Sequence, residues 1–172
     1  LRTAGEERGY VPLLASIAED ADREVSAIER FLELRVCGLI LVSPLLDMAT
    51  LGEYGQVSPT VVLTRNRAPA SVDLVHSDDR ANGRLVTEHL RTQGYDPIVY
   101  LGYERPAEGD SSRERRLGYA DAQEAAGRPV RVFTAARHGA VPEPVAGLEE
   151  LLAPGVGIIC HNDRVAIAMA SR

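Results

Sequence analysis

Short apolar runs alternate with amphipathic segments along this chain. Aliphatic and β-branched runs are typical of buried strands, and they occur at 10–15, 38–43, 60–64, 72–76, 98–101, 130–134 and 156–160. Apolar positions three and four residues apart predict helices at 47–54, 113–126 and 142–152. Two further predicted helices begin at Asp20 and Asp163, and another, around Leu85, ends at Gly94. The residues before Gly9 resemble the last turns of a helix. A helix after most strands predicts an α/β fold with parallel sheets flanked by helices.

Polar side chains follow three of these runs at the point where each predicted strand ends. Asp78 and Asp79 follow the fourth run, the segment 111–116 follows the fifth, and Asn162 with Asp163 follows the last. In an open parallel sheet the ligand crevice lies beyond the carboxyl ends of the strands. We therefore expect these acids, arginines and the amide to converge on one small polar molecule.

Each polar cluster also suits the first turn of the helix that comes after it, because Asp, Ser and Asn cap free backbone N–H groups. Asp78 and Asp79 are one acid more than a cap requires. In the segment Ser111-Ser112-Arg113-Glu114-Arg115-Arg116, the arginines lie at the positive end of the helix dipole, where a partner would compensate them. From the residues alone, capping and ligand binding both stay open.

Charge and hydropathy narrow the classes of partner. The 172 residues carry a formal net charge of −6, so the chain by itself should repel the phosphate backbone of DNA. No apolar stretch approaches the ~20 residues of a membrane span, and the first residues lack the apolar core of a signal peptide. We expect a cytoplasmic protein without a membrane partner.

Catalytic and metal motifs do not occur. The sequence has no GxGxxG, GxxxxGK[ST] or GxSxG motif, and its four histidines lack metal-ligand spacing. Cys37 and Cys160 lie in or beside aliphatic runs and are interpreted as reduced core residues. The sequence therefore predicts a binding protein that is not an enzyme and needs no cofactor and no metal.

Several motifs in a fixed order resemble the LacI/GalR transcriptional regulators. They are Val36-Cys37-Gly38-Leu39-Ile40-Leu41, Asp78-Asp79-x-x-x-Gly83, Ser111-x-Arg113-x-Arg115-x-x-Gly118-Tyr119 and Ile159-Cys160-His161-Asn162-Asp163. The resemblance implies a periplasmic-binding-protein-like fold, with an effector between two lobes that each hold a parallel sheet. It also implies that the chain is truncated at both ends: 1–103 would be the N-terminal lobe without its first strand, and 104–172 an incomplete C-terminal lobe.

The resemblance also assigns residue roles. Asp78 takes the place of the first-lobe acid that binds effector hydroxyls, and Arg115 that of the second-lobe arginine that clamps the ligand. The other candidates for the ligand site are Asp79, Ser111, Arg113, Asn162, Asp163, His138 and Ser43. Two departures matter: the segment 135–139 lacks the aromatic platform that the family often has, and Asp79 replaces a usual asparagine, which favours a hydroxyl-rich or cationic ligand.

The resemblance predicts the effector-sensing domain of a LacI-type regulator, with a sugar as the favoured ligand. It implies a homodimer that contacts operator DNA only through an N-terminal helix-turn-helix headpiece, which this sequence does not include. One alternative is an extracytoplasmic sugar-binding protein of a transport system, which would share the fold and the crevice. Another is an α/β enzyme, which would require an activated nucleophile, a metal or a cofactor loop.

Overall fold

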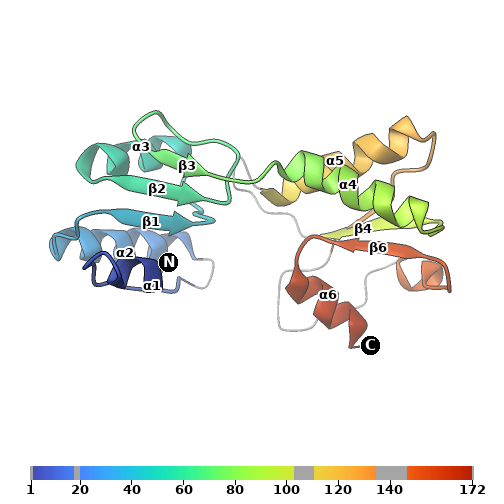
Figure 1. The fold of residues 1–172 in the computed structure, drawn as a ribbon, viewed down its shortest axis with the longest axis horizontal. Coiled ribbons are helices and arrows are strands. Elements are labelled where there is room, and N and C mark those ends of the chain that lie inside the picture. The colour runs from blue at the N-terminus through green and yellow to red at the C-terminus, as the bar shows by residue number, and fades with distance from the viewer. Residues whose placement is uncertain (1, 18–19, 103–110, 135–146, 172) are drawn as a thin grey trace.

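The strands form two separate parallel sheets (Figure 1). The computed structural model describes residues 2–17, 20–102, 111–134 and 147–171. The first sheet has the order β1-β2-β3, formed by β1 (Leu39–Val42), β2 (Thr60–Leu63) and β3 (Asp73–Val75). The second has the order β5-β4-β6, formed by β4 (Ile98–Gly102), β5 (Val132–Thr134) and β6 (Gly157–Cys160). The predicted α/β fold with parallel sheets is confirmed.

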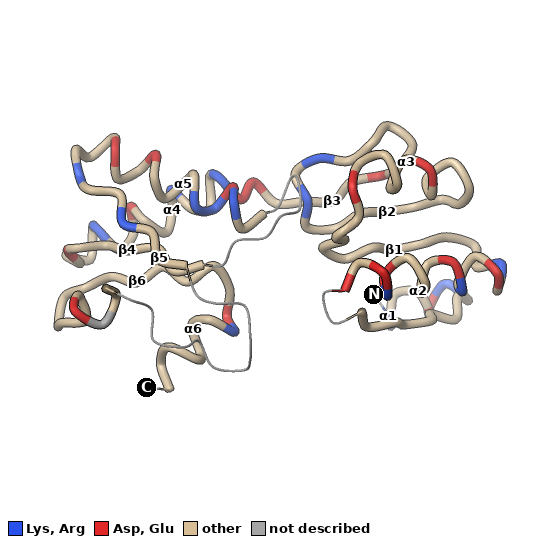
Figure 2. The backbone as a smooth tube through the Cα atoms, turned by 180° about the vertical axis from the view of Figure 1, so that it is seen from behind, with Lys and Arg blue, Asp and Glu red and all other residues tan. Residues whose placement is uncertain are grey.

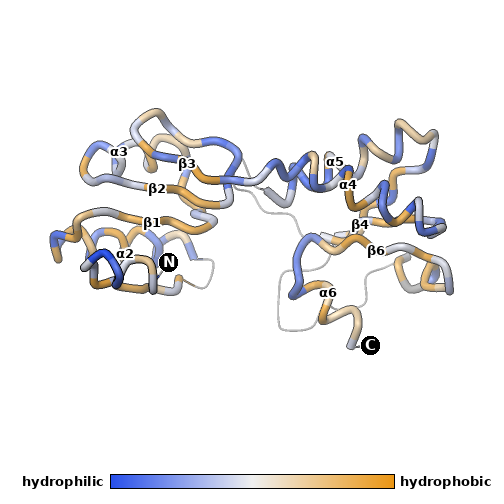
Figure 3. The backbone as a smooth tube through the Cα atoms, viewed as in Figure 1, coloured by the Kyte–Doolittle hydropathy of each residue, from blue (hydrophilic) through white to orange (hydrophobic). Residues whose placement is uncertain are grey.

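Helices flank both sheets. The first sheet is accompanied by α1 (Arg2–Glu6), α2 (Ala21–Glu33) and α3 (Met48–Val57). In the second group, α4 (Asp79–Thr92) and α5 (Ser111–Ala125) lie together on one face, while α6 (Asp163–Ala170) covers the other (Figure 1). A short 3-10 helix, η1 (Glu149–Leu151), precedes β6. The strands are among the most hydrophobic segments of the chain (Figure 3).

Strand β4 organises the core of the second group. All five of its residues are buried, as expected for a parallel strand covered on both faces. Because side chains alternate along a strand, Ile98 and Tyr100 pack with Tyr119 of α5, whereas Val99 and Leu101 pack with Val165 of α6. The two faces of β4 therefore join the α4–α5 pair and α6 into one unit.

The helices α4 and α5 cross at two glycines. A Cβ atom on Gly83 of α4 would run into the backbone carbonyl of Arg115, and one on Gly118 of α5 would run into that of Arg80. Beside this crossing, Arg80 donates from Nε and Nη2 to the two carboxylate oxygens of Asp121, at 2.7 and 2.8 Å. The lack of side chains at two positions thus sets the close approach of the helices.

Three sequence-based predictions are wrong. The segment 10–15 is not a strand, because it has no ladder partner in the described part of the chain, and Val11 and Leu14 are 85% and 97% exposed. The helix predicted at 142–152 does not form from 147 onward: Gly147 has a φ of +78°, which an α-helix does not allow, and only η1 follows. The remainder of that segment lies outside the described residues. The third wrong prediction is Cys37 as a core residue, because Cys37 is exposed. Cys160 is half-buried and packs against the core of the second group, and burial raises the pKa of its thiol.

The pairing of β4 also bears on the lobe boundary predicted at 103/104. Because β4 pairs with β5 and β6, that boundary would separate β4 from the sheet to which it belongs. The last strand of the first sheet ends at Val75, and α4, which packs on α5, begins at Asp79. The change from one sheet to the other therefore lies between these two residues.

Replacing Gly118 with Ala should lower the free energy of unfolding, because the new Cβ would force the two helix backbones apart. We expect a loss of about 1–3 kcal/mol in urea denaturation, typical of overpacking. Gly52→Ala in α3 is the matched control, since its Cβ would meet Pro69 at an ordinary 3.5 Å. That control should gain up to about 1 kcal/mol from helix propensity. Equal effects of both substitutions would contradict the close crossing.

The Arg80–Asp121 ion pair makes a pH-dependent contribution. The hydrogen bonds from Arg80 lower the pKa of Asp121 below its usual value of 3.8. A carboxyl whose pKa is lower in the folded state stabilises the fold above its unfolded pKa and loses that effect as pH falls through its folded pKa. Asp121→Asn should therefore reduce stability at neutral pH, and its difference from the unmodified chain should shrink in acid. Urea denaturation at neutral pH and at about pH 3 tests this; a difference that stayed constant would refute it.

Candidate functional site

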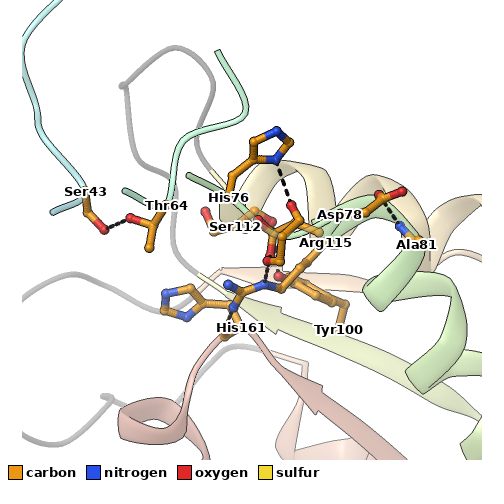
Figure 4. Close-up of polar contacts among 11 residues, drawn as sticks. Ser43, Thr64, His76, Asp78, Ala81, Tyr100, Ser112, Arg115 and His161 are labelled. Atoms are coloured by element: carbon orange, nitrogen blue, oxygen red, sulfur yellow. Dashed lines mark hydrogen bonds and ion pairs between the residues drawn. The ribbon is translucent and has the colours of Figure 1, made fainter. Parts of the chain in front are cut away.

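Arg115 connects three segments that are distant in the sequence. Its Nε donates to Oδ1 of Asp79 at 2.7 Å, and its Nη1 donates to the carbonyl of His161 at 2.6 Å (Figure 4). Asp79 is the first residue of α4, Arg115 lies near the start of α5, and His161 follows the end of β6. One guanidinium therefore ties the starts of two helices to the end of a strand, and brings two of the predicted site residues into direct contact.

The glycine crossing explains why this contact forms. Asp79 lies four residues before Gly83, and Arg115 lies three residues before Gly118. Residues three or four apart share one helix face, so each side chain projects from the face that meets the other helix. Where α4 and α5 begin, acidic and basic positions consequently lie next to each other (Figure 2).

Burial differs between the two members of this pair. The Asp79 side chain is only 3% exposed, whereas that of Arg115 is 35% exposed. A guanidinium has five N–H donors, and among the described residues the bonds of Arg115 use only Nε and Nη1. The Nη2 group can therefore donate to an oxygen atom of a ligand while the pair with Asp79 stays intact.

Asp78, Asn162 and Asp163 lie at the starts of helices. Asp78 accepts from the backbone N–H of Ala81 at 2.9 Å and caps α4. Asn162 accepts through Oδ1 from the N–H of Val165 at 3.0 Å and caps α6, and Asp163 accepts from the N–H of Arg164 at 2.9 Å. The capping interpretation is thus correct for Asp78 and Asn162. It leaves the second carboxylate oxygen of Asp78 and the amide N–H groups of Asn162 available for a ligand.

The other predicted residues are less engaged. Ser111 begins α5 and is half-buried, and Arg113 on the same helix is exposed. Tyr100, buried under the start of α5, donates its hydroxyl to the carbonyl of Ser112 at 3.2 Å and so positions this turn. His138 lies outside the described residues.

Ser43 lies at the end of β1 and bonds to a residue that the sequence analysis missed. Its Oγ is 2.5 Å from Oγ1 of Thr64, which follows β2 (Figure 4). Both residues are in the left-handed region, with φ of +50° and +64°. This conformation costs about 1–3 kcal/mol for a non-glycine residue and often marks a functional site. The sequence did hold a signal for Thr64: it is a polar residue at the end of a predicted strand, the position at which the other candidate residues were sought.

The loop after β1 is held by two buried charged residues. Glu24 of α2 accepts from the backbone N–H of Leu45 at 2.8 Å, and Arg65 donates to the carbonyl of Leu46 at 2.8 Å. Both side chains are nearly inaccessible to solvent. This packing fixes the position of Ser43 at the carboxyl end of β1. In Figure 4 the hydroxyls of Ser43 and Thr64 lie on the first-sheet side of the site.

Metal and membrane features are absent from the described residues. No group of three or more His, Cys, Asp or Glu side chains there could hold a metal ion. None of the helices in the same part of the chain is long and apolar enough to cross a membrane. The site is a set of hydroxyl, carboxylate, amide and guanidinium groups, which suits hydrogen bonding to a polar molecule.

A comparison with protein families gives a match over almost the whole chain. Residues 1–171 match the family described as periplasmic binding proteins and the sugar-binding domain of the LacI family. A curated relative, the ribose operon repressor of Halalkalibacterium halodurans, is 29% identical over 93 residues, which are 54% of this chain and 27% of the repressor. The matched segment thus spans only about a quarter of that relative's length.

Solved structures agree with this match. A protein described as a ribose operon repressor from Burkholderia thailandensis superimposes with a TM-score of 0.77 at 28% identity, over 99% of this chain and 64% of that one. A protein from Alkaliphilus metalliredigens described as a periplasmic binding protein/LacI transcriptional regulator, in complex with D-xylulofuranose, gives a TM-score of 0.79 at 21% identity, over 97% of this chain and 63% of that one. The resemblance predicted from the sequence motifs is confirmed: this chain belongs to the family of periplasmic binding proteins and LacI-type sugar-binding domains.

Proposed function

We propose that this chain is the effector-sensing part of a LacI-type transcriptional regulator and that it binds a sugar between its two sheets. The observation that carries the proposal is the position of Arg115, which Asp79 and the His161 carbonyl hold while Nη2 bonds to none of the described residues. A sugar hydroxyl can accept from this group, and other hydroxyls can donate to Asp78. The names of the relatives and the ligand of the Alkaliphilus structure favour a five-carbon sugar.

A ligand in this position would bridge two lobes, which we place at 2–77 and 78–171. Ser43 and Thr64 belong to the first, while Arg115, Ser111 and Asn162 belong to the second. A ligand that contacts both lobes binds the closed arrangement better than the open one, and so shifts the population toward closure. In a regulator, this shift would change the spacing of paired DNA-binding segments.

The proposed partners follow from this function. Operator DNA would be contacted by a separate basic segment, because the chain itself has a net charge of −6. Paired DNA-binding segments imply a homodimer, and contact with DNA implies the cytoplasm. The alternative of an extracytoplasmic sugar carrier uses the same fold and is included in the family description. The regulator is favoured because the curated relatives are a repressor and a transcriptional regulator.

Sugar binding through Arg115 can be tested on the purified full chain. Calorimetric titration with D-ribose and D-xylulose should give a dissociation constant for at least one of them. The double variant Asp79→Asn, Arg115→Gln leaves no buried carboxylate without a cation. It should weaken binding roughly tenfold to hundredfold, since a hydrogen bond to a charged group contributes about 1.5–3 kcal/mol. The control Arg80→Gln removes the other α4–α5 ion pair and should bind as the unmodified chain does. Unchanged affinity in the double variant would refute the assignment.

Thr64 offers a test of the first-sheet side. Thr64→Gly should weaken sugar binding without loss of stability, because glycine adopts a φ of +64° freely and removes strain of about 1–3 kcal/mol. Thr60→Gly, at the start of β2, is the control. Its buried hydroxyl donates to the Ser58 carbonyl at 2.9 Å, so that variant should lose stability. Thermal denaturation and titration measure both effects, and a marked destabilisation by Thr64→Gly would contradict the strain.

A further inference from the structure

We propose that Asp79 is a built-in counterion of Arg115, and that it makes the site select neutral sugars over anionic sugar derivatives such as phosphates and acids. This inference rests on the proposed function and adds the charge class of the ligand. The pair is arranged asymmetrically: the carboxylate is 3% exposed, while the arginine that it neutralises is 35% exposed. A ligand would therefore meet a cation whose charge is already balanced.

The contacts of Asp79 make this neutralisation permanent. Its Oδ1 accepts from Nε of Arg115 at 2.7 Å, and the hydroxyl of Ser77 lies 3.3 Å from the same oxygen. Asp79 also starts α4 directly after its cap, so the backbone holds it in place. A buried carboxylate without a cation would be unstable, and a ligand therefore cannot displace it from Arg115 at low cost.

The surroundings add to the discrimination against anions. Helix N-termini usually attract anions, but Asp78 already caps α4, and Asp163 places a second carboxylate in the first turn of α6. An anion at Nη2 of Arg115 would meet the charge of Asp79, which accepts from the same guanidinium. A sugar hydroxyl accepts hydrogen bonds from the same N–H groups without electrostatic repulsion, because it carries no charge. Arg113 is exposed, so solvent and salt screen its attraction.

Removal of the counterion should reverse this preference. In Asp79→Asn the side chain keeps its shape and can still accept from Arg115 through its amide oxygen, but the guanidinium becomes an uncompensated cation. A phosphate or carboxylate group could then pair with it in the bidentate way that arginine favours. Neutral sugars should bind the variant much as before, because the Nη2 donors are unchanged.

Inorganic phosphate is the probe, titrated into the full chain at constant ionic strength and followed by calorimetry and by melting temperature. The unmodified chain should bind phosphate weakly, and Asp79→Asn should bind it about tenfold more tightly or better, as expected when one nearby like charge is removed. The double variant with Asp79→Asn and Arg115→Gln should lose this gain. Asp121→Asn, the matched control, removes the acid of the other α4–α5 ion pair and should bind phosphate as the unmodified chain does.

The outcomes separate this inference from the proposed function. The inference is overturned if the unmodified chain binds phosphate as tightly as Asp79→Asn does, or if the gain persists without Arg115. If Asp79→Asn fails to fold, the unmodified chain still decides: it must bind D-ribose or D-xylulose more tightly than the corresponding 5-phosphate, and the opposite order overturns the inference. A chain that binds neither sugar nor sugar phosphate refutes the proposed function, while the phosphate result for Asp79→Asn still stands.

Discussion

The buried contact between Asp79 and Arg115 is the interaction on which the candidate site depends. The carboxylate is almost completely removed from water, where a charge without a partner is costly. Arg115 must therefore be held against the start of α4, and its bond to the His161 carbonyl fixes both helices to the end of β6. The position of one side chain thus determines how three distant segments meet.

Stability and geometry come from different contacts in this region. A buried ion pair contributes little net stability, because the cost of desolvation cancels much of the attraction. The close crossing of α4 and α5 instead rests on two glycines and on the apolar layer beneath the helices, where Tyr119 packs against Ile98 and Tyr100. The hydroxyl of Tyr119 also donates to the Ile98 carbonyl at 3.0 Å, which anchors α5 to β4. Packing supplies the rigid frame, and the ion pair sets the polar atoms within it.

Local patterns in the sequence predicted most elements but not their partners. Six of the seven predicted strands form, because a run of β-branched residues favours a strand through interactions that reach only a few residues. The strand prediction at 10–15 is wrong because a strand also needs a neighbouring strand to pair with, which the sequence does not reveal. The same limit explains why the sequence did not reveal the pairing of Asp79 with Arg115, which are 36 residues apart. The polar residues at predicted strand ends supplied most of the candidate site residues, and the resemblance to a family assigned their roles, whereas their contacts required the fold.

Helix capping and ligand binding, which the sequence left as alternatives, use different atoms of the same residues. The oxygen of Asp78 that accepts from Ala81 fixes the side chain, and its second oxygen is left at the surface. Asn162 accepts through its oxygen, so its N–H donors stay available. Arg115 follows the same rule, since two of its nitrogens bind the protein and the third is unengaged in the described part of the chain. Side chains fixed in this way lose little conformational entropy when a ligand arrives, so capping prepares the site for binding.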